Sequence, residues 1–224
     1  MSDIDARLAR VVAWIRDSTD GAAGRGALVP VSGGSDSALC LWLCAQALPR
    51  GHVTAAYAGT SLRCREWFEA LAPVRFVQAP DATPQHVEAA RWALMLSLSL
   101  ELRGWLVGTR NRTEETLGTF SLASRVATFL PLAGLWKSEV MAACAHVGVP
   151  AEILASSRRA DPACGRPQAM ADIPFEHVDA FLRVRSGDAP LATLDALPRE
   201  TVAYLDATWR RNRFKQSLPL AGPS

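Results

Sequence analysis

The segment from Ala27 to Leu48 reads Ala-Leu-Val-Pro-Val-Ser-Gly-Gly-Ser-Asp-Ser-Ala-Leu-Cys-Leu-Trp-Leu-Cys-Ala-Gln-Ala-Leu. Its first five residues are a short apolar run, which predicts a buried parallel strand, and Pro30 suits only the end of such a strand. Residues 38–48 are apolar nearly all round and predict a buried helix. The glycine- and serine-rich residues between them predict a tight turn that leads from the strand into the helix.

The predicted turn has the features of a phosphate-binding loop. Two adjacent glycines allow close approach of backbone N–H donors, and the helix that follows directs the positive end of its dipole at a bound anion. Asp36 offers a carboxylate for Mg²⁺. The loop lacks the lysine of the G-x-x-x-x-G-K-[ST] pattern, which binds a γ-phosphate in another class of phosphate-binding loop. A serine-capped glycine turn would explain any single residue here, but not the whole combination behind a buried strand. We therefore expect the nucleotide's phosphates at Ser32, Gly33, Gly34, Ser35, Asp36 and Ser37.

The rest of the chain alternates in the same way. Further strands are predicted over residues 53–57, 74–77, 105–107 and 128–132, and helices over residues 3–17, 64–71, 84–102 and 136–147. This alternation indicates an α/β fold with a doubly wound, mostly parallel, five-stranded sheet, helices on both faces, and ligands at the carboxyl ends of the strands. After residue 150 only helices are predicted, over 175–185 and 198–213, as a helical C-terminal tail on a single domain, residues 1–224.

Composition narrows the function classes. The 224 residues are 49% hydrophobic, enough for a sizeable core, and 24 basic against 22 acidic residues leave a net charge of +2. Without a run of like charge, neither nucleic acid nor an anionic membrane is expected as a partner. The N-terminus lacks a secretory pattern, and the apolar stretch of residues 92–100 is too short to span a bilayer. We expect a cytoplasmic protein.

Five cysteines, an odd number without a C-x-x-C pair, argue against disulfides and structural zinc. Cys40 and Cys44 would share one helix face and could clamp a metal, but burial in the core is the favoured interpretation. Cys164, in a Pro- and Arg-rich loop, is the candidate for a reactive thiol.

Several segments resemble a known family. Ser32–Ser37 is similar to the S-G-G-x-D-S loop of the ATP pyrophosphatase group, which includes NAD, GMP and asparagine synthetases and tRNA-modifying enzymes. Val107–Glu114 resembles the G-T-x-N-x-S-E segment of NAD synthetases. Matching segments in the same order are Leu130–Val140, His146–Ile153 and Phe214–Pro219. The chain therefore resembles the NAD synthetase family from residue 28 to its end.

This resemblance implies a Rossmann-like fold of the adenine nucleotide alpha hydrolase type and an ATP-dependent amide ligase. A carboxylate would attack the α-phosphate, release pyrophosphate and form an acyl-adenylate, and ammonia would then displace AMP. Asp36 and Glu114 would hold Mg²⁺, and Lys137 would add positive charge at the phosphates, so these three residues are the expected catalytic set. Thr109 would contact the ATP.

The resemblance also implies substrate and partner features. Arg91, Asp161 and Lys215 would face the second substrate, a small-molecule carboxylate, and the enzyme would be a homodimer. Only 31 residues precede Ser32, so no glutaminase domain is expected before the loop. Ammonia would then be free or delivered by a separate protein.

The sequence departs from the family pattern mainly at positions that the resemblance assigns to the second substrate. Residues 121–130 contain no carboxylate where the family carries G-D-x-x-x-D, the later D-E pair is missing from residues 166–172, and Phe214 and Gln216 replace a histidine and an arginine. These losses predict that deamido-NAD is a poor substrate and that another carboxylate is amidated, with Arg125, Arg158 and Arg159 as new anion contacts. A degenerate, weakly active NAD synthetase would look similar.

Two other function classes stay open. A sulfur-transferring or tRNA-modifying pyrophosphatase would need a reactive cysteine, for which only Cys164 is a candidate. A nucleotide-binding module without catalysis would sense ATP or AMP. The presence of both candidate metal ligands, Asp36 and Glu114, argues against that module.

Overall fold

The computed structural model describes residues 3–20, 25–83, 86–158 and 168–217. Within this part of the chain, four parallel strands form the sheet: β1 (Ala27–Pro30), β2 (Val53–Ala58), β3 (Val74–Val77) and β4 (Trp105–Leu106). Their order across the sheet is β3-β2-β1-β4. Ala27 pairs with Val53 on one side and with Trp105 on the other, so β1 lies inside the sheet.

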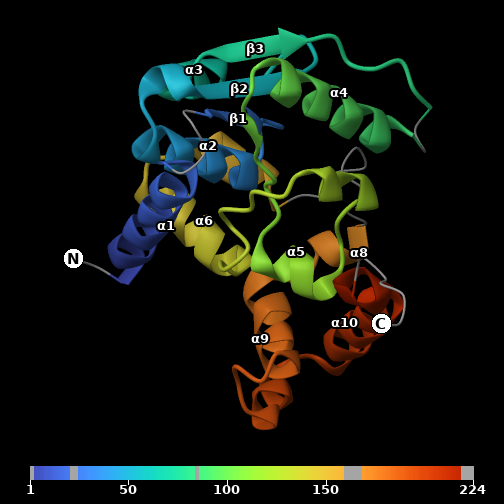
Figure 1. Ribbon diagram of the computed structural model, residues 1–224. Coiled ribbons are helices and arrows are strands. Elements are labelled where there is room, and N and C mark those ends of the chain that lie inside the picture. The colour runs from blue at the N-terminus through green and yellow to red at the C-terminus, as the bar shows by residue number, and fades with distance from the viewer. Residues whose placement is uncertain (1–2, 21–24, 84–85, 159–167, 218–224) are drawn as a thin grey trace, which may run out of the picture.

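Helices account for most of the remaining described chain (Figure 1). The α-helices are α1 (Asp3–Asp20), α2 (Ser35–Ala47), α3 (Arg65–Leu71), α4 (Val87–Glu101), α5 (Arg112–Leu117), α6 (Lys137–His146), α7 (Ala151–Ser156), α8 (Gln168–Ala171), α9 (Phe175–Arg185) and α10 (Arg199–Asn212). The short 3₁₀ helices are η1 (Arg50–His52), η2 (Leu122–Val126), η4 (Leu191–Ala196) and η5 (Arg213–Ser217). Among the described residues, no helix combines the length and the hydropathy needed to cross a bilayer.

The two faces of the sheet bury alternate residues of the same strands, as the side-chain period of two requires. Val29 and Ala55 belong to the larger core, which is filled mainly from α1, α2, α3 and α6. Leu28 and Ala56 point the other way and pack with Met95 and other apolar residues of α4. The α/β class with a parallel sheet and helices on both faces is confirmed.

The prediction of five strands is wrong for the described residues. The fifth predicted strand, residues 128–132, contributes one isolated parallel bridge, between Phe129 and Val107. Pro131 has no N–H to donate, and Ala133 N bonds to Leu130 O at 3.2 Å, so the chain turns before a ladder can form. The largely apolar sequence of residues 128–132 did not reveal this turn.

The C-terminal residues form the expected helical tail. A separate apolar cluster joins α9 and α10 to α5 and to Trp136, with Phe181, Leu182 and Leu205 fully buried. Figure 1 shows α9 and α10 on the far side of α5 from the sheet. The tail therefore packs against the segment that follows β4, not against the sheet itself.

A shared carboxylate ties α1 and α9 to the start of α6. Glu139 Oε2 accepts a hydrogen bond from Trp136 N at 3.0 Å, which caps the helix. Glu139 Oε1 lies 2.8 Å from Arg7 Nη1 of α1 and 2.6 Å from Arg183 Nη2 of α9. The guanidinium groups of Arg112 and Arg183 lie 4.3 and 5.1 Å from the centre of the Trp136 ring. The first helix of the chain and α9 of the C-terminal tail are thus anchored at one helix terminus.

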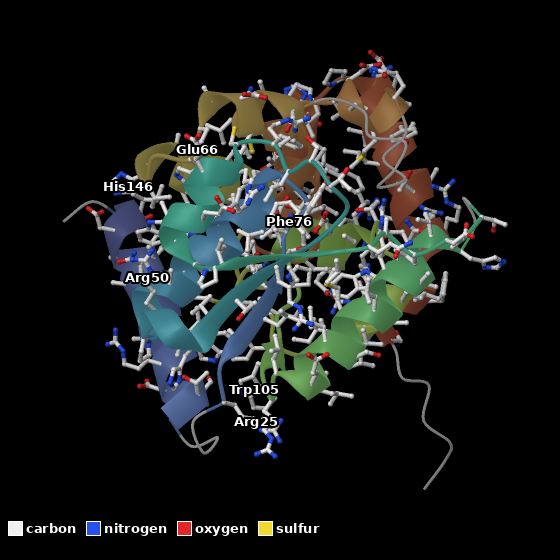
Figure 2. The ribbon with its side chains drawn as sticks, turned by 90° about the horizontal axis from the view of Figure 1, so that it is seen from above. Arg25, Arg50, Glu66, Phe76, Trp105 and His146 are labelled. Carbon is white, nitrogen blue, oxygen red and sulfur yellow. The ribbon has the colours of Figure 1, made fainter. Side chains whose placement is uncertain are left out.

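The direction of the strands decides where a ligand can bind. Trp105 marks the start of β4, and the guanidinium of Arg25, just before β1, lies 6.0 Å from its ring (Figure 2). These two side chains lie at the amino-terminal edge of the sheet. The loop of residues 31–34 and the segment of residues 107–111 leave the opposite, carboxyl edge.

We predict that Gly118→Ala destabilises the fold much more than Gly148→Ala. Both glycines have left-handed φ, +71° and +77°, but a Cβ on Gly118 would lie 2.6 Å from Asn212 Cβ in α10, whereas nothing lies within 4 Å at Gly148. Strain alone costs about 1 kcal/mol, and the added clash should bring Gly118→Ala to roughly 2 kcal/mol or more. Urea unfolding of both variants measures the difference. Equal losses would show that the α5–α10 contact relaxes freely.

Candidate active site

The candidate site lies where β1 and β4 run side by side. The chain leaves β1 toward α2 on one face of the sheet, and it enters β4 from α4 on the other face. At such a switch point the loops that follow the two strands diverge and leave a crevice at the carboxyl edge, the usual ligand position in open α/β sheets. The predicted phosphate loop follows β1 and the G-T-R-N segment follows β4.

The loop after β1 is shaped by its own serines. Gly33 has φ +76°, which favours glycine, and Gly34 is the extended N-cap of α2. Gly34 N donates to Ser32 Oγ at 3.3 Å, and Ser37 Oγ donates to Gly34 O at 3.0 Å. Ser37 Oγ also accepts from Ser32 N at 3.2 Å. These bonds hold the turn open ahead of the helix N-terminus, where backbone N–H groups have no helical partner.

Asp36 and Lys137 meet at the start of α2. The Lys137 ammonium pairs with Asp36 Oδ2 and donates to Ser35 Oγ at 2.9 Å. The Lys137 side chain is 10% exposed, whereas the Asp36 side chain keeps 21% of its surface. A buried ammonium needs such partners, and the pair brings one positive charge to the glycine loop. The structure thus joins residues that stand far apart in the sequence.

Glu114 completes this arrangement from the β4 side. Asn111 caps α5, because Asn111 Oδ1 accepts from Glu114 N at 3.0 Å and Asn111 N donates to Glu114 Oε2 at 3.2 Å. The other end of the same amide, Asn111 Nδ2, donates to Asp36 Oδ1 at 2.8 Å. Loss of solvent and the negative charge of Asp36 raise the pKa of Glu114 to about 7, while Lys137 acts in the opposite direction. The carboxylate of Asp36 is therefore close enough to influence the ionisation of Glu114.

The other predicted site residues are less tightly placed. Thr109 lies half-buried in the loop between β4 and α5. Arg91 lies one turn inside α4 with its guanidinium 3.2 Å from Glu88. Asp161 falls outside the described residues. The contacts of Lys215 are with its own chain: Nζ donates to Gly118 O at 2.9 Å and to Phe120 O at 2.7 Å. Their roles toward substrate stay predictions.

Arg125, expected as a new anion contact, also serves the fold. Arg125 Nη2 donates to Lys215 O at 2.5 Å. Its guanidinium, that of Arg110 and the Lys215 ammonium lie within 5.5 Å of the centre of the Phe120 ring. Arg110 additionally pairs with Glu115 and donates to Ser124 Oγ. These cations tie η5 to α5 and η2.

None of the described cysteines has a pKa lowered toward the thiolate. Cys40, Cys44 and Cys144 are fully buried, and burial raises the pKa of each, to about 12 for Cys44 and Cys144. The pKa of Cys64 is also raised, by loss of solvent and by Glu152. The interpretation of Cys40 and Cys44 as core residues is confirmed by their burial. A nucleophilic cysteine requires a lowered pKa. Cys164 falls outside the described residues.

Several polar residues at the site were not assigned a role from the sequence. Asn111 could have been found, because an asparagine followed three residues later by glutamate is an N-cap signature. Ser157, whose Oγ accepts from Ser35 N at 3.0 Å, carries no such signal. Thr113 and Asp179, which contact the start of α6, also lack one.

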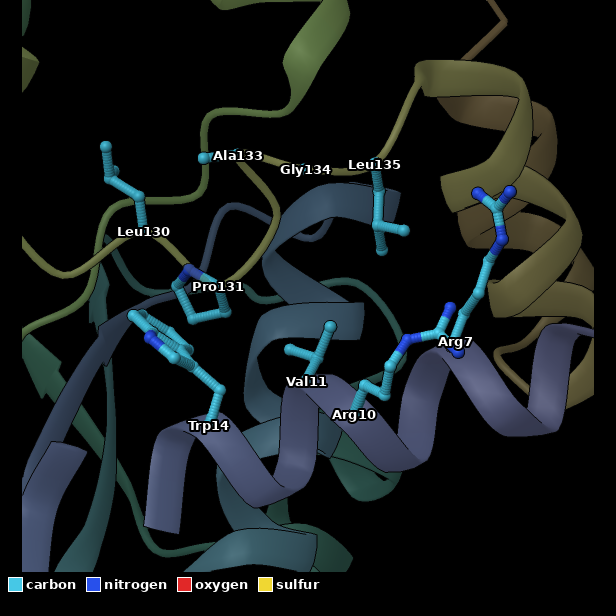
Figure 3. Close-up of a pocket in the computed structure, with 9 residues that line it drawn as sticks. All are labelled: Arg7, Arg10, Val11, Trp14, Leu130, Pro131, Ala133, Gly134 and Leu135. Atoms are coloured by element: carbon cyan, nitrogen blue, oxygen red, sulfur yellow. The ribbon is translucent and has the colours of Figure 1, made fainter. Parts of the chain in front are cut away.

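A hollow elsewhere on the molecule does not coincide with this site. A cavity of about 410 Å³ lies between α1 and residues 130–135, with Trp14, Pro131 and Leu135 on its walls and Arg7 at one end (Figure 3). The Trp14 ring stacks on Phe129 at 4.8 Å. None of the predicted site residues that the structure describes lines this cavity.

Comparisons with known proteins agree with the arrangement at the switch point. The family model described as NAD synthase matches residues 78–219. A curated relative, the NH(3)-dependent NAD(+) synthetase of Methanosarcina mazei, is 25% identical over 97% of both chains. The NH3-dependent NAD synthetase of Campylobacter jejuni (TM-score 0.79, 19% identity) and the NMN synthetase of Francisella tularensis (TM-score 0.78, 18% identity) share the fold over 100% of both chains.

The family match covers more than half of the chain and includes the Asn111–Glu114 cap and Lys137. The phosphate loop precedes the matched residues, but the aligned relative extends over it. The protein belongs to the NAD synthase family and is an ATP-dependent carbon–nitrogen ligase.

Proposed function

We propose that this protein amidates the carboxylate of deamido-NAD with ammonia and converts ATP to AMP and pyrophosphate. The observation that carries the proposal is the junction of Asp36, Lys137 and Asn111 at the glycine loop. Together with Glu114, which bonds to Asn111, it combines a helix N-terminus, one ammonium group and two carboxylates at the crevice where an α/β sheet binds its ligand. The family match and the curated relatives support the choice of substrate.

The residues present fit a Mg²⁺ ion bound together with ATP. Asp36 and Glu114 are close enough for the charge of Asp36 to raise the Glu114 pKa, and a divalent cation would relieve that repulsion. Among the described residues no cluster of three or more His, Cys, Asp or Glu side chains could hold a metal alone. Mg²⁺ often takes only one or two carboxylates and completes its shell with phosphate oxygens and water. Asp36 and Glu114 would hold it, and it would offset negative charge on the phosphates.

The reaction then needs positioning and charge stabilisation without a protein nucleophile. A substrate carboxylate oxygen attacks the α-phosphorus, the bond to the bridging oxygen breaks, and pyrophosphate leaves with that electron pair. Ammonia attacks the acyl carbon of the adenylate, AMP leaves, and a proton is lost as the amide forms. Lys137 and the N–H groups at the start of α2 would stabilise the charge on the departing pyrophosphate. Thr109 would contact the nucleotide.

A second candidate substrate is a smaller acid that carries one nucleotide. Residues 121–130 hold no carboxylate, and in the structure they include η2, whose Arg125 bonds to the C-terminal segment. One protein with this fold is named NMN synthetase, so the fold accommodates a product smaller than NAD. Arg91, Asp161 and Lys215 are proposed to face either acid.

The assembly and the ammonia source are proposals from the family resemblance. A homodimer would place two sites in one particle, and ammonia would be free or supplied by a separate protein. Sulfur transfer would have to use Cys164, because none of the four described cysteines has a lowered pKa. A nucleotide sensor would not need two carboxylates beside Lys137.

The first test of the proposal is the position of ATP cleavage. With MgATP, ammonia and deamido-NAD, we expect AMP and pyrophosphate, and Asp36→Ala and Glu114→Ala should each lower the rate by about 100-fold or more. Anion-exchange chromatography of the nucleotides measures both effects. Formation of ADP and phosphate would contradict the assignment.

Lys137→Ala should weaken ATP binding and slow turnover, each by about tenfold or more, because a phosphate charge loses its ammonium partner. Cys164→Ser is the control and should keep nearly full activity, since amidation requires no thiol. Calorimetric titration with ATP and steady-state rates measure the two variants. A folded but inactive Cys164→Ser protein would favour sulfur transfer instead.

Substrate choice is decided by comparing deamido-NAD with nicotinic acid mononucleotide under saturating ATP and ammonia. The proposed reaction predicts a kcat/KM of about 10⁴ M⁻¹s⁻¹ or more for deamido-NAD. If carboxylates at residues 121–130 were needed to bind it, each lost hydrogen bond would cost about 1 to 3 kcal/mol and lower that value. A higher value for the mononucleotide would support the smaller acid. A value above that limit for deamido-NAD alone would identify an ordinary NAD synthetase.

A further inference from the structure

A buried carboxylate in the C-terminal tail contacts the two elements that carry Lys137 and Glu114. Asp179, on α9, is 2% exposed. Its Oδ1 accepts from Thr113 Oγ1 at 2.5 Å, and its Oδ2 accepts from Ser138 N at 2.8 Å. Thr113 Oγ1 in turn accepts from Lys137 N at 2.7 Å. Both carboxylate oxygens of Asp179 therefore accept hydrogen bonds from described residues.

This network supplies hydrogen-bond acceptors for the first two N–H groups of α6, which have no partner inside the helix. Lys137 N bonds to Thr113, and Ser138 N bonds to Asp179 directly. A negative charge at a helix N-terminus is also favoured by the helix dipole. The start of α6 is thus fixed at two successive residues, and the first of them is Lys137.

The same network fixes the start of α5. Thr113 is 5% exposed and immediately precedes Glu114 in the first turn of that helix. Its hydroxyl is both a donor to Asp179 and an acceptor from Lys137 N, so one oxygen links α5, α6 and α9. A shift of this oxygen would move the backbones of Glu114 and Lys137 together.

We infer that Thr113 and Asp179 are positioning residues, which hold the Lys137 ammonium at the nucleotide's phosphates through the backbone at the start of α6. The inference rests on the proposed role of Lys137 in binding ATP. A buried carboxylate has a large desolvation cost, and an apolar residue would pack as well without it. The specific gain from the charge is the fixed geometry of the two N–H groups, which a catalytic site requires within fractions of an ångström.

The test is a double-mutant cycle on ATP affinity, measured by calorimetry with Mg²⁺ present. Thr113→Val removes the hydroxyl at nearly constant volume and should weaken ATP binding about tenfold. Thr113→Ser retains the hydroxyl and should bind within about twofold of the unmodified protein. In a Lys137→Ala background, Thr113→Val should change the affinity by less than about twofold, because the group it positions is gone.

Controls separate this effect from a general loss of folding. Asp206→Asn, in α10, removes a carboxylate paired only with Arg185 and Arg210 in the described contacts, and should leave ATP affinity unchanged. Thermal unfolding of each variant gives its stability. If Thr113→Val does not fold, Asp179→Asn is taken through the same cycle.

The possible outcomes are distinct. Equal weakening by Thr113→Val with and without Lys137 would overturn the positioning role, as would unchanged affinity in a folded Thr113→Val protein. Unchanged affinity in Lys137→Ala would instead contradict the proposed function of Lys137, and the inference with it. Loss of the Thr113→Val effect in the Lys137→Ala background, together with recovery in Thr113→Ser, supports the inference.

Discussion

The Lys137 ammonium lies between Asp36 and Ser35 in a part of the molecule that has little solvent. A buried positive charge is stable only where oxygen acceptors surround it, so this contact constrains how α6 can approach α2. The N-termini of both helices then point toward the same crevice. The glycine loop, the Asn111 cap and the packing of α9 on α6 are all consistent with that single geometric requirement.

The lysine beside the glycine loop comes from a distant part of the chain. A loop that binds a γ-phosphate usually carries its lysine within the loop, whereas here the positive charge comes from the start of α6. An ammonium supplied by another helix can be adjusted by whatever holds that helix. In this protein the start of α6 is held by Glu139, Thr113 and Asp179. Glu139 is linked to α9 through Arg183, and Thr113 through its hydrogen bond to Asp179, which lies on α9. The tail therefore helps to position the site, and Phe175 of α9 lies beside it, with its ring centre 5.5 Å from Lys137 Nζ.

The sequence was most informative where local chemistry leaves few alternatives. The strand, glycine turn and helix of residues 27–47 were predicted because buried apolar runs and paired glycines have few other uses. β4 was located, but its short ladder and the single bridge at Phe129 depend on Pro131 and a turn, which apolar periodicity does not detect. α5 was not predicted, because six residues give too short a pattern.

The candidate site was predicted in part for the same reason. Asp36, Glu114 and Lys137 were selected by motif, and the structure brings the first and last into contact. Ser157 and Asp179 could not be selected, since their partners are defined only when distant helices pack together. For Lys215 the sequence suggested a substrate contact, but its described bonds are to backbone carbonyls at the end of α5 and just beyond it.

The strand order has a consequence for how the chain folds. β1 is synthesised first and lies inside the sheet, yet its neighbour β4 follows only after β2, α3, β3 and α4 have been made. Until β4 arrives, one edge of β1 exposes unpaired N–H and C=O groups on an apolar strand, the kind of edge on which chains aggregate. The interval is long because the pairing partners are distant in sequence, which also slows folding. Expression at low temperature or with chaperones should therefore improve the yield of native protein.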